Sequence, residues 1–122
     1  MCQGKQLALV LEDDESAAEA LALVLQDWGA DVERAANGLT LIEALGDRIA
    51  EARWIIADYH LGEGMNGVAA ARLMAADAPA VRVLVLTGSV SPVAERDAAD
   101  AGFEIMRKPV PAQTILAWLE RP

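Results

Sequence analysis

The sequence lacks the features on which several classes of protein depend. Its only cysteine is Cys2, which excludes a disulfide within the chain and favours a reducing compartment. No apolar stretch approaches the roughly 20 residues needed to span a bilayer, and the first residues show no secretory signal. We therefore expect a cytoplasmic domain that makes no contact with a membrane.

Basic residues are also scarce in this chain. The formal net charge is −9 at pH 7, and Lys5 and Lys108 are the only lysines. Binding to a nucleic-acid backbone needs clustered lysine and arginine side chains, so this charge balance argues against a nucleic-acid ligand. It leaves room for a cation site or a basic partner. Solubility explains most of the acidic residues, but not those that follow the predicted strands.

Short apolar runs alternate with helical patterns five times along the chain. Unbroken apolar runs are typical of strands buried on both faces of a parallel sheet. The alternation predicts one α/β domain over residues 1–122, with its core over about 6–120 and helices on both faces of the sheet. The predicted strands are 7–11, 31–35, 54–57 ending at Asp58, 81–86 and 103–106. The first predicted helix begins after Asp14 or Ser16 and ends at Gly29, and the second lies around 41–45. The other three cover 68–76, 92–101 and 111–119.

Polar side chains stand where four of these strands end. Glu12 and Asp13 follow the first strand, Asp58 ends the third, and Thr87 and Lys108 follow the fourth and the fifth. In an open α/β sheet, ligands bind at the carboxyl ends of the strands. We therefore expect these five side chains to form one site.

The chemistry of this set suits phosphoryl transfer to Asp58. Carboxylates at neighbouring strand ends repel one another, and a hard cation such as Mg²⁺ relieves the repulsion. A carboxylate can act as a nucleophile and form an acyl phosphate if the incoming charge is neutralised. Lys108 would supply a positive charge and Thr87 a hydroxyl donor, while Gly88 leaves room for the phosphoryl group. Taken singly, the acids could instead be helix-capping or turn residues.

The ordered set resembles the receiver domain family, also called the response-regulator or chemotaxis-regulator-like family. The resemblance runs from Leu7 to about Leu119 and rests on LVLEDDE, IIADYHLG, LVLTGS and RKPV. It implies a doubly wound, flavodoxin-like fold with five parallel strands in the order 2-1-3-4-5. It also implies a domain of a two-component phosphorelay that takes a phosphoryl group from a histidine kinase or a histidine phosphotransfer domain. Such a domain changes conformation to signal and catalyses only its own phosphorylation and dephosphorylation.

The family pattern assigns a role to each residue of the set. Asp58 would be the phosphoacceptor, and Thr87 and Lys108 would bind the phosphoryl group. A Mg²⁺ or Mn²⁺ ion would be held by Glu12, Asp13, Asp58 and the main-chain carbonyl of His60. The Lys108–Pro109 bond would be cis. The resemblance also admits a homodimer through the face formed by the helix of 92–101, the last strand and the last helix.

The chain departs from the family pattern at several positions. Ile105 stands three residues before the lysine, where the family often has a tyrosine or phenylalanine that acts as a rotamer switch with the threonine. The loop 62–66 looks one residue longer than its commonest form. His60 and Ser89 occupy positions that modulate phosphoryl lifetime, so that lifetime stays open.

The sequence also admits several alternatives. The motifs are especially similar to receivers at the C-terminus of bacterial hybrid histidine kinases, but a stand-alone regulator fits them nearly as well. A degenerate receiver would serve only as an interaction module, and it would have lost an acid, the threonine or the lysine. An aspartate-nucleophile phosphatase needs a second acid two residues after its nucleophile, where this chain has His60. A flavin mononucleotide carrier would need a phosphate loop where the acidic run 12–14 stands.

Overall fold

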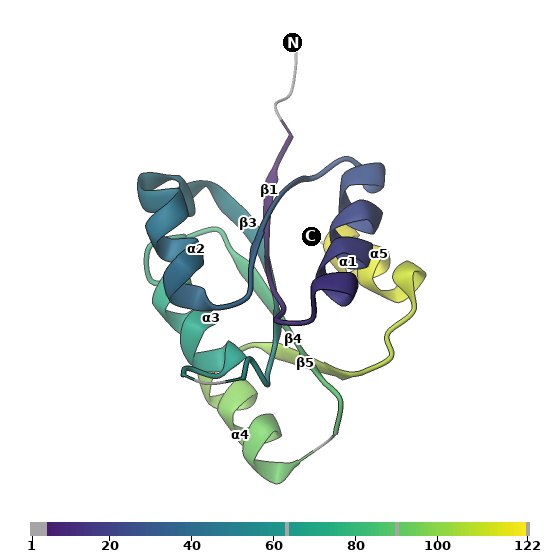
Figure 1. The fold of residues 1–122 in the computed structure, drawn as a ribbon. Coiled ribbons are helices and arrows are strands. Elements are labelled where there is room, and N and C mark those ends of the chain that lie inside the picture. Colours follow the sequence, from purple (N-terminus) through teal and green to yellow (C-terminus); the bar gives the residue numbers. More distant parts are fainter. Residues whose placement is uncertain (1–4, 63, 90, 122) are drawn as a thin grey trace.

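Five parallel strands form the centre of the computed structural model, which describes residues 5–62, 64–89 and 91–121. Their order is β2-β1-β3-β4-β5, as the resemblance implied (Figure 1). The strands are β1 (Leu7–Leu11), β2 (Asp31–Ala35), β3 (Ala52–Asp58), β4 (Arg82–Thr87) and β5 (Glu104–Arg107). The predicted fold class is therefore confirmed.

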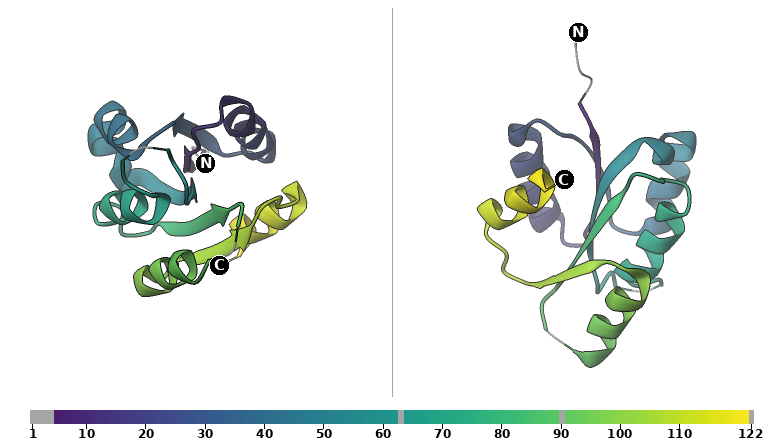
Figure 2. Two further views of the ribbon diagram at one scale, coloured as in Figure 1. Left: turned by 60° about the horizontal axis from the view of Figure 1, so that its bottom comes forward. Right: turned by 180° about the vertical axis from the view of Figure 1, so that it is seen from behind.

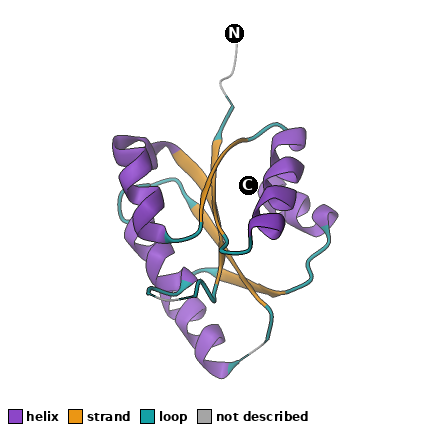
Figure 3. Cartoon of the chain, viewed as in Figure 1, coloured by secondary structure: helices purple, strands orange, loops and turns teal. Residues whose placement is uncertain are grey.

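Helices cover both faces of this sheet (Figures 2 and 3). They are α1 (Glu15–Trp28), α2 (Gly38–Leu45), α3 (Gly67–Ala75), α4 (Pro92–Ala101) and α5 (Ala112–Glu120). In Figure 1, α1 and α5 lie on one side of the sheet, and α2, α3 and α4 lie on the other. Parallel strands need such crossover connections, because after each strand the chain must return to the same end of the sheet before the next strand begins.

Side chains of β1 show how the sheet divides the core into two parts. Leu7, Leu9 and Leu11 pack with buried residues of α2, α3 and α4, whereas Ala8 and Val10 pack with buried residues of α1 and α5. All five are at most 3% exposed. Alternate side chains of a strand point to opposite faces, so the unbroken apolar run predicted from the sequence is what a doubly covered strand requires.

Local signals account for most helix ends. The Asp14 carboxylate accepts a hydrogen bond from the Ala17 amide at 3.1 Å and caps α1, which decides between the two predicted caps. Gly102 ends α4 in the left-handed conformation, with φ 77°. Pro111 is the N-cap of α5 and not part of its first turn, because its ψ of 145° is extended.

The structure also corrects some predicted boundaries. A 3-10 helix, Gly46–Glu51, follows α2 and was not predicted; it buries Ile49. The strands β3, β4 and β5 and the helices α3 and α5 differ from their predicted ends by one or two residues, because hydrophobic patterns locate elements better than their ends. The Lys108–Pro109 bond is cis, as expected.

Two further expectations concern the environment of the protein. Cys2, on which the expectation of a reducing compartment rested, lies outside the described residues. Among the residues that the structure describes, no helix is both long and apolar enough to cross a bilayer.

Candidate functional site

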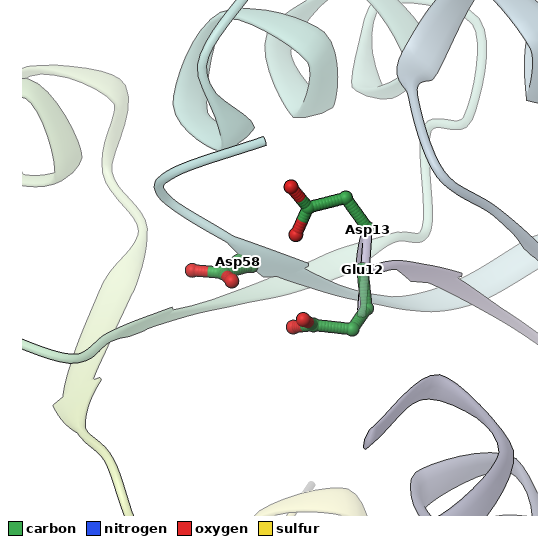
Figure 4. A group of neighbouring side chains, drawn as sticks. All are labelled: Glu12, Asp13 and Asp58. Carbon is green, nitrogen blue, oxygen red and sulfur yellow. The ribbon is translucent and has the colours of Figure 1, made fainter. Parts of the chain in front are cut away.

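Three carboxylates meet where two neighbouring strands end. Strand β1 pairs with β3 so that Leu11 lies opposite Ala57, which brings Glu12 and Asp13 beside Asp58. One carboxylate oxygen from each of the three lies within 4.8 Å of the others. Figure 4 shows Glu12 and Asp13 leaving the end of β1 in different directions, with both carboxylates ending near that of Asp58. The sheet order thus gathers acids that lie far apart in the sequence.

Burial differs among the three acids. Glu12 and Asp58 are each 8% exposed, whereas Asp13 is exposed. Burial raises the pKa of the Glu12 carboxyl above its usual range. Hydrogen bonds from Lys108 and from the Asp14 amide oppose this rise, and the charge of Asp58 adds to it. Negative charge is therefore costly at Glu12 unless a cation lies close to it.

Lys108 provides a fixed cation at this site. Its Nζ donates hydrogen bonds to Asp58 Oδ2 at 2.9 Å and to Glu12 Oε2 at 3.1 Å. Its main-chain amide donates to the Thr87 carbonyl at 2.7 Å, which ties it to the end of β4. Burial alone would lower the pKa of the Lys108 ammonium, but its hydrogen bonds to Asp58 and Glu12 outweigh burial and raise it. Lys108 therefore stays protonated between the two acids.

Thr87 lies close to this cluster but its hydroxyl is engaged elsewhere. Asp58 is the register partner of Leu86 on β4, and Thr87 is the residue that follows Leu86. The Thr87 hydroxyl donates a hydrogen bond to the Ser89 carbonyl at 2.7 Å, and it accepts one from the Ser89 amide at 3.4 Å. Thr87 thus holds the start of the loop after β4. A Cβ added at Gly88 would meet no atom within 4 Å, so space is open beside this residue.

His60 contributes to the site through its main chain. Its amide donates to Asp58 Oδ1 at 3.2 Å, so both oxygens of Asp58 are held. Its imidazole packs edge-on against Tyr59, with ring centroids 5.0 Å apart, and the residue is exposed. The side chain therefore behaves as a loop residue.

Two neighbours of Asp58 were not singled out from the sequence. Tyr59 is 7% exposed, and its hydroxyl donates to Asp97 on α4 at 2.7 Å. Gly67, at the start of α3, packs against the main chain of Asp58. The Asn66-Gly67 pair was recognisable as a helix start, since Asn66 caps α3. Nothing local could reveal the partner of Tyr59, which lies 38 positions away.

The donor set fits a hard divalent cation. All three side chains offer carboxylate oxygens, which Mg²⁺ and Ca²⁺ prefer as ligands. The exposure of Asp13 leaves the cluster open to solvent, as suits an ion that keeps several waters. A carboxylate nucleophile at Asp58 would thus have a cation site on one side and Lys108 on the other.

Comparison with known proteins bears on this arrangement. Residues 8–120 match the response regulator receiver domain family. The transcriptional regulatory protein ZraR of Escherichia coli O157:H7 is 29% identical over 114 residues, which cover 93% of this chain and 25% of that protein. The chain thus spans about a quarter of the length of the curated relatives that it matches.

Two solved structures are similar over nearly the whole chain. A response regulator protein from Burkholderia pseudomallei, solved with a phosphorylated aspartic acid, a calcium ion and citrate, has a TM-score of 0.78 and 31% identity. The match covers 95% of this chain and 67% of that one. The chemotaxis protein CheY4 of Vibrio cholerae has a TM-score of 0.82 and 25% identity, with 96% of this chain and 98% of that one covered.

Proposed function

This chain belongs to the response regulator receiver domain family of two-component systems, and we propose that Asp58 is the residue on which it accepts a phosphoryl group. The observation that carries the proposal is the position of Lys108, whose ammonium bridges Asp58 and Glu12 within a three-carboxylate cluster. A buried carboxylate with a cation held against it is poised to bear the charge of an acyl phosphate.

The proposed reaction is attack by an Asp58 carboxylate oxygen on the phosphorus of a phosphohistidine. The new O–P bond forms as the P–N bond breaks, and the imidazole leaves with the bonding electron pair. Lys108 would hold one carboxylate oxygen and balance the charge of the bound phosphoryl group. The Thr87 hydroxyl would exchange the Ser89 carbonyl for a phosphoryl oxygen, since it lies next to the register partner of Asp58.

The proposed metal is Mg²⁺ or Mn²⁺, held by Glu12, Asp13, Asp58 and the main-chain carbonyl of His60. When bound, a divalent ion supplies positive charge that stabilises the phosphoryl oxygens during transfer. The fit of the three carboxylate oxygens supports this assignment.

Receiver domains interact with histidine kinases or histidine phosphotransfer domains, and we propose such a protein as the phosphodonor here. A hollow of about 320 Å³ between α1 and α5 supports a docking position beside the site. Its lining is mostly apolar and includes Glu12, Ala17, Leu21, Val24, Lys108 and Ile115. An apolar surface of the donor seated there would bring its phosphohistidine to the cluster. The ATP used by a kinase is intracellular, so we propose the cytoplasm as the place of this reaction.

The parent protein and the assembly are also proposals. Similarity to receivers of hybrid histidine kinases makes such a kinase one proposed parent, and a stand-alone regulator is the other. A homodimer through α4, β5 and α5 remains a prediction from the family. The 62% exposure of the apolar Val93 on α4 supports it, and sedimentation with and without a phosphoryl mimic would test it.

Two other functions receive less support. A degenerate receiver would lack part of the site, whereas the acids, Thr87 and Lys108 are all present and lie close together. An aspartate-nucleophile phosphatase needs a second acid for proton transfer, and the residue at that position is His60, whose imidazole packs on Tyr59.

Phosphorylation of variant proteins tests the assignment. We expect wild-type protein incubated with acetyl phosphate and Mg²⁺ to gain the mass of one phosphoryl group, and Asp58→Asn to gain none. Asp14→Asn is the matched control, because Asp14 caps α1 and asparagine caps equally well. Phosphorylation of Asp58→Asn at the wild-type rate would disprove the role of Asp58.

A further inference from the structure

Tyr59 connects the proposed phosphoacceptor to α4. It follows Asp58 directly, and its main-chain amide donates to the Leu86 carbonyl of β4 at 2.8 Å. Its side chain lies in the core between the sheet and the helices of that face and is 7% exposed. At its far end, the hydroxyl donates to Asp97 Oδ2 at 2.7 Å. One residue thus spans the distance from the end of β3 to the second turn of α4.

This hydrogen bond is the main polar attachment of α4. Among the described residues, it is the only side-chain hydrogen bond that joins α4 to another element, and no ion pair does so. The apolar attachment rests on small side chains, since Ala94 and Ala98 are the residues that α4 buries. Small side chains bury little area and so hold a helix weakly.

The site and α4 are joined at a second point. The loop from Thr87 to Ser91 leads from β4 into α4, and Ser91 caps the helix by accepting from the Ala94 amide at 3.0 Å. The Thr87 hydroxyl holds the other end of this loop through Ser89. A change in the partner of Thr87 would therefore pull on the start of α4, while Tyr59 restrains its second turn.

We propose that the Tyr59–Asp97 hydrogen bond is a latch that keeps α4 in its resting position and opens when the domain is phosphorylated. The latch deepens the proposed function and rests on it. It supplies an exchangeable polar contact that Ile105 cannot provide, because isoleucine has no polar side-chain atom. We take the structure as the resting state because the Thr87 hydroxyl donates its hydrogen bond to the Ser89 carbonyl, and the Tyr59–Asp97 hydrogen bond is present in the same structure.

The energetic consequence follows from linkage. A contact that exists only in the resting state opposes binding of any ligand that favours the other state. The contact favours the resting state by some factor in the equilibrium constant. Removing the contact therefore raises the affinity for that ligand by this factor. One partly buried hydrogen bond to a carboxylate corresponds to about five- to tenfold in an equilibrium constant.

The test measures beryllofluoride binding in the presence of Mg²⁺, with beryllofluoride as the phosphoryl mimic. We expect Tyr59→Phe to bind beryllofluoride about five- to tenfold more tightly than wild type. The amide signals of α4 in the mimic-free variant should also shift toward their positions in the mimic-bound wild type. Asp100→Asn is the matched control on α4, an exposed acid with no such bond among the described residues, and it should match wild type.

A double-mutant cycle separates the latch from effects of either side chain alone. Asp97→Ala should have the same effect as Tyr59→Phe, and the double variant should bind no more tightly than either single one. Phenylalanine fills the same space as tyrosine, so the fold is retained, and circular dichroism checks this. Unchanged or weaker binding by Tyr59→Phe, or full additivity in the cycle, would overturn the latch.

Failure of the latch and failure of the proposed function give different results. If wild-type protein binds beryllofluoride and Asp58→Asn does not, but Tyr59→Phe equals wild type, only the latch is wrong. If wild-type protein binds no beryllofluoride with Mg²⁺ present, the phosphoacceptor assignment fails and the latch fails with it.

Discussion

Gly67 packs directly against the main-chain carbonyl of Asp58. A Cβ added at Gly67 would overlap that carbonyl oxygen and lie 3.2 Å from the Cα of Tyr59. The Gly67 amide also donates to the Tyr59 carbonyl at 3.0 Å. Because no other residue type lacks a Cβ, the first turn of α3 can approach the end of β3 only through glycine.

We therefore predict that Gly67→Ala destabilises the domain and disturbs the site. The added methyl group must push α3 away from Asp58, at a cost of about 2–3 kcal/mol in the free energy of unfolding. Urea unfolding measures this loss, and acetyl phosphate labelling should slow as Asp58 shifts. Gly88→Ala is the control for stability, since its methyl group would enter open space. Equal losses in the two variants would contradict the steric explanation.

Glu12 should make the metal-free protein less stable as the pH rises. Burial raises the pKa of this carboxyl in the folded state, so the folded protein holds the proton at pH values where the unfolded chain has lost it. Stability is then greatest below the pKa of the unfolded chain and falls as the pH rises through the raised folded value. Glu12→Gln removes this titration and should be more stable than wild type at pH 7.

Unfolding in urea with a chelator, at a series of pH values, tests whether stability falls as the pH rises. The advantage of Glu12→Gln should disappear once the pH falls below the ordinary pKa of glutamate, where both side chains are neutral. A variant that is less stable than wild type at neutral pH would show that Lys108 more than offsets the burial of Glu12.

Asp13 should govern metal affinity without affecting the fold. It is exposed and supplies one of the three clustered carboxylate oxygens, so Asp13→Asn removes a charged ligand. We predict that Mg²⁺ binding, followed by calorimetry, weakens more than tenfold, in line with the dependence of such sites on carboxylate charge. Asp14→Asn removes the same charge from the neighbouring residue and should bind Mg²⁺ as wild type does. Similar losses in both variants would point to net charge instead of ligation.

Ile105 should respond little to phosphorylation. It has stiff χ1 preferences and no polar atom, and it lies beside Thr87 at a small hollow of about 60 Å³. We predict that beryllofluoride shifts the amide signals of Gly88, Ser89 and Ser91 more than the methyl signals of Ile105. Heteronuclear NMR with and without the mimic compares them. The largest change at the Ile105 methyls would restore a switch role to that position.

Much of the fold was predictable from local patterns. Apolar runs and helical spacing identified all five strands and all five helices, and β1, β2 and α4 were predicted with the bounds that the structure shows. The candidate site was partly predictable for the same reason. Once Glu12, Asp58 and Lys108 fall at strand ends, the rule that ligands gather at the carboxyl edge of a parallel sheet brings them together. The 3-10 helix Gly46–Glu51 was missed because six residues carry too short a pattern to distinguish it from a loop.

What the sequence by itself determined was therefore the type and order of the elements and the polar residues at their ends, since these depend on neighbours a few positions apart. Only the tertiary structure decided which side chains touch. Lys108 reaches Asp58 across 50 positions, and Tyr59 reaches Asp97 across 38. Gly67 is required at its position because α3 packs on the end of β3. Such contacts depend on the order of the strands and the packing of helices on the sheet, and no local periodicity encodes a distance between residues so far apart.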